Sequence, residues 1–253
     1  LSVRTPGFHP GKRGSIPLGV TKQEVRINMN MKENLKYVVD KINKVKISTE
    51  PFDHFVIHDF LPADLYGRLV QANNKLTNDN LKAIQKIEIP NKGDFKPTLE
   101  NIHEAGTITY NMYKADDIHE EVDVLLSNVK VKEAIFGRFD VTEEAKGGSE
   151  LVRKINIDLK PHTDMNHEGL LLNFQVYCPI DNSRSNLGLK LLKKFNAFNL
   201  MESYMMIETI PFVPNVAWCI KPSENSWHKV DPIKNLTDYN RDSLMMRYYR
   251  IDT

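Results

Sequence analysis

From about Glu150 to Ile251 the chain is divided into short β-rich segments separated by turn residues. Runs such as GLLLNFQVYC, SYMMIETIPF and NVAWCIKP carry the branched and aromatic residues that strands favour, and no long helical period interrupts them. About seven or eight such strands can bury their apolar faces by closing into a barrel or by packing as two sheets. The pattern therefore predicts a jelly-roll β core for this half of the chain.

The first half has a different pattern, and we expect the chain as a whole to be an α+β protein. The segments PFDHFVIHDFLP and TITYNMY indicate strands. Helical periods fall in four ranges: 31–45, 63–74, 116–128 and 129–136. Residues 1–30 are predicted to form an irregular arm. One domain is expected over 31–253, with a helical and mixed part at 31–149 packed on one face of a β core at 150–253.

Charge and composition exclude several function classes. The 253 residues include 34 Lys and Arg and 33 Asp and Glu, a net charge of +1, so no overall field attracts nucleic acid or an anionic membrane. The two cysteines are too few for a disulfide scaffold. No apolar run approaches the roughly 18 residues that a membrane-spanning helix needs. These features predict a cytoplasmic protein with no nucleic-acid or membrane partner.

A metal-ligand pattern follows one predicted strand, in the segment IDLKPHTDMNHEG. His162 and Asp164 are two residues apart, and alternate side chains of an extended chain share a face. A histidine followed two places later by an acid should occur roughly once by chance in such a sequence, and His119 with Glu121 is a second case. His119 falls in a polar helical segment, where it is expected to be a surface residue. His162 instead follows Pro161 at the predicted mouth of the barrel.

His228, in NSWHKVDP, is the candidate third ligand, because the strands between it and His162 can cross the barrel and return. Two imidazoles and one carboxylate leave three positions of a six-coordinate ion open, which is the arrangement of non-haem Fe(II) oxygenases. Two alternatives remain at this point. His228 could be a satisfied core histidine, or the three residues could hold a structural zinc.

The last predicted strand, RDSLMMRYY, places Arg241 and Ser243 on one face. A buried guanidinium there requires an anion, and a carboxylate matches its planar fork. On GLLLNFQVYC the alternation puts Asn173, Gln175 and Tyr177 on one face, which should line the lumen unless it faces solvent. Arg247 shares the parity of Arg241, and both a lumen-facing and a solvent-facing position are open to it.

With these motifs the chain resembles the Fe(II)- and 2-oxoglutarate-dependent dioxygenases with a double-stranded β-helix core, particularly the prolyl-hydroxylase-like branch. The resemblance covers about residues 50–251. It includes PFDHFVIHDFLPADLYGRL, the PHTD metal motif, LGLKLL, PNVAWCIKPSENSWHKV and RDSL. The chain departs from the pattern in having only Gly188 where relatives often carry a glycine pair, and in a somewhat long interval from His228 to Arg241.

The resemblance implies a function and a set of roles. His162, Asp164 and His228 would hold Fe(II), while Arg241, Ser243 and Tyr177 would bind the distal carboxylate of 2-oxoglutarate, with no catalytic residue beyond the metal centre. Dioxygen would be consumed, and ascorbate could stimulate the reaction. The reaction would couple decarboxylation of 2-oxoglutarate to succinate with hydroxylation of a small-molecule, amino-acid or peptide substrate. Asp164 favours hydroxylation over halogenation, because halogenases carry a small residue there.

Two other functions remain open from the sequence. One is a non-catalytic β-barrel module that binds a metal or a carboxylate, and the other is hydrolysis by a zinc-bound water. The intact triad together with Arg241 counts against the binding module, and Arg241 and Ser243 count against the hydrolase. His167, close to Asp164, is expected at the site entrance and not on the metal.

Overall fold

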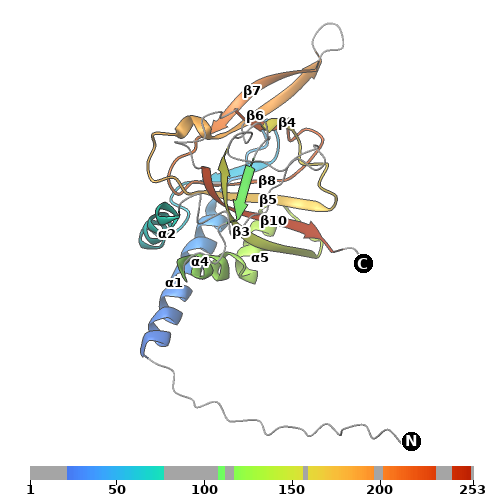
Figure 1. Cartoon of the computed structure of the whole chain (residues 1–253). Coiled ribbons are helices and arrows are strands. Elements are labelled where there is room, and N and C mark those ends of the chain that lie inside the picture. Colours follow the sequence, from blue (N-terminus) through green and yellow to red (C-terminus); the bar gives the residue numbers. More distant parts are fainter. Residues whose placement is uncertain are drawn as a thin grey trace, which may run out of the picture.

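The computed structural model describes residues 22–76, 108–111, 117–155, 159–196, 202–231 and 241–251. These residues form two antiparallel sheets and a group of helices, which confirms the predicted α+β class. The helices cover one face of the larger sheet, and the smaller sheet lies beyond its other face (Figure 1).

The helices occupy the ranges in which apolar residues recur at helical spacing. Val38 and Ile42, four residues apart, are fully buried on one face of the first helix. The α-helices of the described residues are α1 (Lys22–Lys44), α2 (Ala63–Lys75), α4 (Asp117–Leu126) and α5 (Val129–Arg138). Because α1 already begins at Lys22, the predicted irregular arm 1–30 is wrong for its last part; residues 1–21 lie outside the described residues.

The larger sheet has six strands in the order β1-β8-β5-β10-β3-β2. They are β1 (His54–Ile57), β2 (Ile108–Asn111), β3 (Ala145–Ile155), β5 (Leu170–Tyr177), β8 (Ala217–Ile220) and β10 (Arg241–Arg250). The two strands predicted in the first half, β1 and β2, form its edges. The β core therefore draws strands from both halves of the chain, and β3 begins at Ala145, slightly before the predicted start at 150.

The smaller sheet has four strands in the order β4-β9-β6-β7. They are β4 (Leu159–His162), β6 (Leu189–Asn196), β7 (Glu202–Ile210) and β9 (His228–Val230), and a short 3-10 helix, η2 (Ser185–Leu187), precedes β6. Gly188, just before β6, is required by close packing, since a Cβ there would lie 2.0 Å from the Ile210 carbonyl oxygen.

Two apolar clusters stabilise the layers. One lies between the helices and the larger sheet, where Phe174 contacts Phe55 and Phe60 edge to face. The other lies between the two sheets and includes Tyr177 and Trp218. The strands β5 and β8 and most of β10 are therefore buried on both faces, and their second face points toward the smaller sheet.

His119 corrects one expectation. It was predicted to be a surface residue of a polar helix, but its exposed fraction is only 2%. Its Nε2 lies 3.0 Å from the side-chain oxygen of Asn73, which is also buried. A buried histidine on α4 thus pairs with a buried amide on α2, so the polar appearance of the segment reflects only its outer face.

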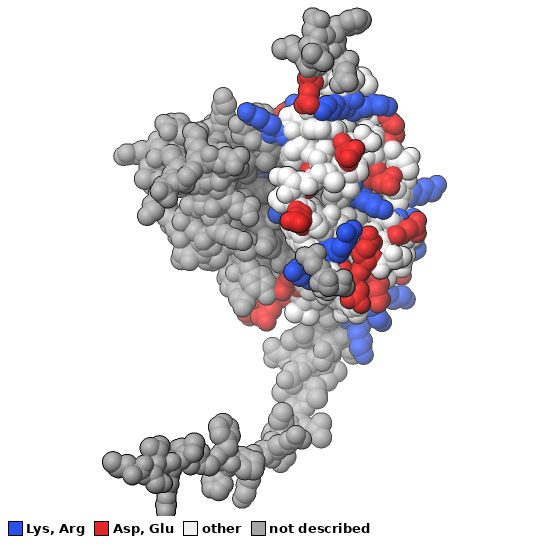
Figure 2. Space-filling view, turned by 90° about the vertical axis from the view of Figure 1, so that its right-hand side faces the viewer, with Lys and Arg blue, Asp and Glu red and all other residues white. Residues whose placement is uncertain are grey.

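The surface shows no dominant charge. On the face in Figure 2, basic and acidic side chains are mixed over the described surface, as the net charge of +1 leads one to expect. Within the described ranges, no helix combines the length and apolarity that crossing a bilayer requires.

Candidate metal centre and anion pocket

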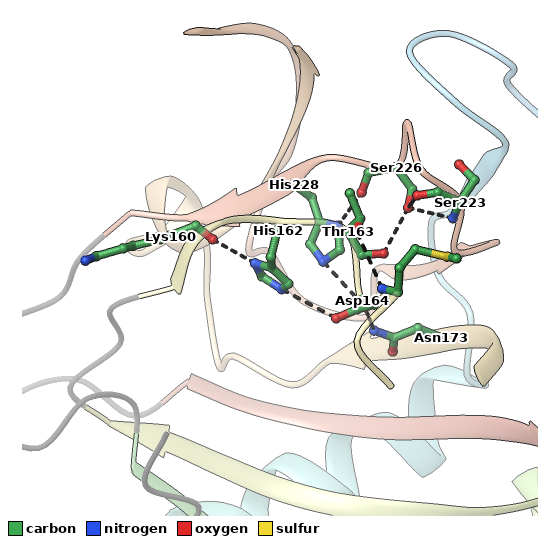
Figure 3. Close-up of polar contacts among 9 residues, drawn as sticks. Lys160, His162, Thr163, Asp164, Asn173, Ser223, Ser226 and His228 are labelled. Atoms are coloured by element: carbon green, nitrogen blue, oxygen red, sulfur yellow. Dashed lines mark hydrogen bonds and ion pairs between the residues drawn. The ribbon is translucent and has the colours of Figure 1, made fainter. Parts of the chain in front are cut away.

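His162, Asp164 and His228 converge at one end of the smaller sheet (Figure 3). His162 ends β4 and His228 begins β9, and the two residues are direct partners in the pairing of these strands. Asp164 lies in the turn after β4. One potential ligand atom from each of the three residues lies within 4.8 Å of the others, so a single ion could contact all three.

Backbone hydrogen bonds orient both imidazoles. The Nδ1 of His162 lies 2.7 Å from the Lys160 carbonyl oxygen, and the Nδ1 of His228 lies 2.8 Å from the Ser226 carbonyl oxygen. A carbonyl can only accept, so each neutral ring carries its proton on Nδ1 and presents an unprotonated Nε2. Each Nε2 lies 3.5 Å from an oxygen of Asp164. The three donor atoms therefore face the same point.

Asp164 is fixed in position and kept ionised. Its backbone has a φ of 61°, a left-handed conformation that aspartate tolerates better than most residues, and its exposed fraction is 5%. The Asn173 side-chain amide on β5 donates to Oδ2 at 2.9 Å. Burial alone would raise the pKa of Asp164, but the hydrogen bond from His162 and the charge of His228, which these rings supply when protonated, hold that pKa well below its ordinary value together with the Asn173 amide. The carboxylate is thus available as an anionic ligand.

Ser226 connects the segments that carry the ligands. This fully buried hydroxyl lies 3.0 Å from the Thr163 carbonyl oxygen and 2.8 Å from that of Ser223, and it accepts the Ser223 backbone N–H at 2.9 Å. It thereby joins the turn before β9 to the turn that carries Asp164. Sequence reasoning missed the roles of Ser226 and Asn173, because only the fold brings them to the ligands.

Arg241 forms the second part of the site, in the space between the sheets. It is 2% exposed, its Nε donates to the Leu187 carbonyl oxygen at 3.1 Å, and its Nη2 donates to the Tyr177 hydroxyl at 3.1 Å. The guanidinium also packs over the rings of Tyr177 and Phe212. Within the described part of the chain, no carboxylate forms an ion pair with it. A buried cation of this kind is suited to an anionic ligand.

Tyr177 and Ser243 complete this anion pocket. The two residues are partners in the pairing of β5 with β10. The Tyr177 hydroxyl accepts from Arg241 and from the Leu189 backbone N–H at 3.2 Å, so its own proton remains for an acceptor. Burial raises the pKa of Tyr177, which keeps the hydroxyl protonated. The Ser243 hydroxyl is buried and has no hydrogen-bond partner among the described residues. Both can therefore donate to a ligand beside Arg241.

Further polar atoms without partners lie on the same inner face. The side-chain oxygens of Asn173 and Gln175 are buried and unpartnered in the described structure, and both residues are about 95% buried. The polar face of β5 thus points between the sheets and not to solvent, as predicted. Unpartnered buried polar atoms call for an explanation in a native fold, and a polar ligand or ordered water supplies one. The residues present therefore fit a metal ion with a bound carboxylic acid.

Several other predicted positions are now placed. Arg247 shares the inner face of β10, because it alternates with Met245 and Ser243 along the strand. His167 is not among the three clustered residues. Trp218 is buried in the β core, whereas Trp227 is partly exposed and lies beside Tyr204 and Lys194.

Comparison with known proteins gives fold neighbours but no sequence relatives. No protein-family model matches the chain, and no curated protein matches it. A prolyl hydroxylase from Trichoplax adhaerens, solved with a peptide fragment of the hypoxia-inducible factor oxygen degradation domain, superposes with a TM-score of 0.51 at 14% identity, covering 91% of this chain and 94% of that one. At this identity the similarity shows a shared fold.

Two bacterial structures are also similar. A prolyl-4-hydroxylase from Pseudomonas putida has a TM-score of 0.48 and 15% identity, over 86% of this chain and 100% of that one. An oxidoreductase of the 2OG-Fe(II) oxygenase family from Burkholderia pseudomallei has a TM-score of 0.45 and 9% identity, over 87% and 90% of the two chains.

Proposed function

We propose that this protein is an Fe(II)- and 2-oxoglutarate-dependent oxygenase of the prolyl-hydroxylase-like branch, and that its two sheets form a double-stranded β-helix. The observation that carries the proposal is a pair of sites in one fold. A His-Asp-His cluster with oriented Nε2 atoms lies at one end of the smaller sheet, and a buried Arg241, which pairs with no carboxylate of the described residues, lies between the two sheets. A structural metal site would need no such cation.

Each residue has a role in this proposal. His162, Asp164 and His228 would hold iron, and Arg241 would bind the distal carboxylate of 2-oxoglutarate with hydrogen bonds from Tyr177 and Ser243. When bound, iron supplies the activation of dioxygen that the reaction requires. The protein orients the cosubstrate between its arginine anchor and the metal, and the apolar residues around Tyr177 exclude water from that space.

The overall reaction consumes one 2-oxoglutarate and one dioxygen and releases succinate and carbon dioxide. One oxygen atom enters succinate, and the other enters the substrate as a hydroxyl group. The substrate is proposed to be a peptide, an amino acid or another small molecule. The Trichoplax neighbour, whose fold this chain shares, was solved with a peptide fragment, which supports a peptide as one of these options.

The test is succinate production by the purified protein. The protein is loaded with Fe(II) under nitrogen and exposed to air with 2-oxoglutarate, and succinate is measured over time, since such enzymes turn over slowly without substrate. We expect succinate from the wild type and almost none from Asp164→Ala. Metal binding without any 2-oxoglutarate binding would replace this proposal with a binding module. Hydrolytic activity with Zn²⁺ alone would replace it with a hydrolase.

A further inference from the structure

Arg247 has a buried donor that no described residue satisfies. Its Nε is inaccessible to solvent and has no hydrogen-bond partner among the described residues. No ion pair joins its guanidinium to a carboxylate in the same part of the chain. The residue lies on the inner face of β10, six positions after Arg241 on the same face. A second arginine therefore faces the space between the sheets, and no carboxylate of the described residues is paired with it.

The two arginines lie at opposite ends of this space. Six residues of extended strand separate their Cα atoms by about 20 Å. Arg247 is the direct partner of Asn173 in the pairing of β10 with β5, and the Asn173 amide donates to the metal-ligand candidate Asp164. Arg241 instead lies beside Tyr177, at the far end of β5. Arg247 thus belongs to the metal end of the site, and Arg241 to the opposite end.

The unpartnered polar atoms at the metal end of the site favour one kind of ligand. A buried guanidinium donor that loses water without gaining an acceptor destabilises the fold, and a carboxylate satisfies it best, with charge and two parallel acceptors. The side-chain oxygen of Asn173, across the strand pair, is also buried and unpartnered. A ligand that carries a carboxylate and a nearby N–H or O–H group would satisfy both atoms.

We propose that Arg247 binds a carboxylate group of the substrate beside the metal, so that the substrate is a carboxylic acid. This inference rests on the proposed function, because it assigns the substrate class of the same site. The carboxylate that Arg247 binds could also be the metal-side carboxylate of 2-oxoglutarate. The experiment below distinguishes the substrate carboxylate from that of 2-oxoglutarate.

The probe is carbon-13-labelled acetate, with neutral acetamide as the matched ligand control. The protein is loaded with Mn(II) and saturating 2-oxoglutarate under nitrogen, and the paramagnetic broadening of the probe signal reports binding near the metal. Wild type, Arg247→Gln and Arg247→Lys are compared. Arg250→Gln is the control variant, since Arg250 is on the same strand but exposed and beside Glu143. Thermal melting of each variant verifies folding, and the dissociation constant of 2-oxoglutarate is measured separately.

We expect acetate but not acetamide to be broadened by the wild type and by Arg250→Gln. Arg247→Gln should weaken acetate binding at least about tenfold, Arg247→Lys should weaken it less, and neither should change 2-oxoglutarate affinity. Equal acetate broadening in wild type and Arg247→Gln would overturn the inference. Weakened 2-oxoglutarate binding in Arg247→Gln would overturn it as well, by assigning the carboxylate to the cosubstrate.

Failure of the proposed function gives a different result. If the wild type binds Mn(II) but not 2-oxoglutarate, the oxygenase proposal fails while the acetate comparison, run without 2-oxoglutarate, still decides whether Arg247 holds a carboxylate. Dependence of acetate broadening on Arg247 in that case would support a carboxylate site beside a metal. If acetate broadening did not depend on Arg247 in that case, both the oxygenase proposal and the carboxylate site at Arg247 would be rejected.

Discussion

His162 and His228 face each other across paired strands, with ring centroids 4.3 Å apart. The geometry of the metal centre therefore depends on the register of β4 against β9. A slip of one residue would turn one of the two imidazoles to the opposite face of the sheet. The Ser226 hydroxyl, which joins the turn after β4 to the turn before β9, helps to hold that register.

Replacing His228 with alanine should remove metal binding. The variant loses one of three ligands, so the affinity for Mn(II) or Co(II) should fall by more than the ~100-fold that loss of a supporting residue can cost. Isothermal titration measures this directly. His167→Ala is the matched control, because His167 is close in sequence but outside the cluster. Equal losses in both variants would indicate that His228 is not a ligand.

Asn173→Ala should weaken the metal centre without abolishing it. The amide holds Oδ2 of Asp164 at 2.9 Å, and loss of such a supporting hydrogen bond typically costs about 10- to 100-fold in metal affinity. Gln175→Ala, on the same face of β5, should retain the wild-type affinity for the metal. The prediction fails if the two variants bind Co(II) equally well.

Arg241→Gln should affect the cosubstrate and leave the metal in place. The substitution removes the buried charge beside Tyr177, so the 2-oxoglutarate affinity should drop by at least about 100-fold, while Mn(II) affinity stays near that of the wild type. Both constants can be measured by titration under nitrogen. Unchanged 2-oxoglutarate affinity would transfer the anchoring role to another cation, and Arg247 is the first candidate.

Asp164→Ala should stop succinate formation even at saturating iron. The change removes the anionic ligand and opens its position to water or halide. The positive charge of the metal is then no longer offset, and its coordination geometry changes. Succinate is followed in wild type and variant at several Fe(II) concentrations. Equal succinate rates in wild type and variant at high Fe(II) would mean that Asp164 is not a metal ligand. Its spacing from His162 would then be a chance occurrence.

Both cysteines should resist thiol reagents in the native protein. Cys178 and Cys219 are buried, and burial raises the pKa of each thiol above its ordinary value, so little reactive thiolate is present. Ellman's reagent should report no fast-reacting thiol in buffer and two thiols in denaturant, since the chain holds two cysteines. A native thiol that reacts within minutes would reveal local opening around β5 or β8.

The sequence predicted the parts of this fold that depend on local pattern. The helices α2, α4 and α5 begin and end within two residues of their expected bounds, because apolar spacing and turn residues are local signals. The strand alternation on β5 also placed Asn173, Gln175 and Tyr177 on the inner face. The three metal-ligand candidates were found because His162 and Asp164 are two residues apart in an extended segment, and because the strands between His162 and His228 can cross the barrel and return.

The remaining features depend on contacts between distant segments, which no local pattern reports. His119 is buried because α2 presents Asn73 to it, and Ser226 acts on the site only because its turn lies beside Thr163. The inner position of Arg247 follows from the pairing of β10 with β5. The division into domains and the location of the protein in the cell stay predictions.

The central position of β10 has a consequence for how the chain reaches its native state. β10 follows every other described strand in sequence, yet it separates β5, β8 and β1 from β3 and β2 in the larger sheet. During synthesis, these two groups of strands would remain unjoined, with unpaired backbone edges, until residues 241–250 leave the ribosome. The same late segment carries Arg241 and Arg247. A nascent chain therefore completes its sheet and its anion pocket in a single step.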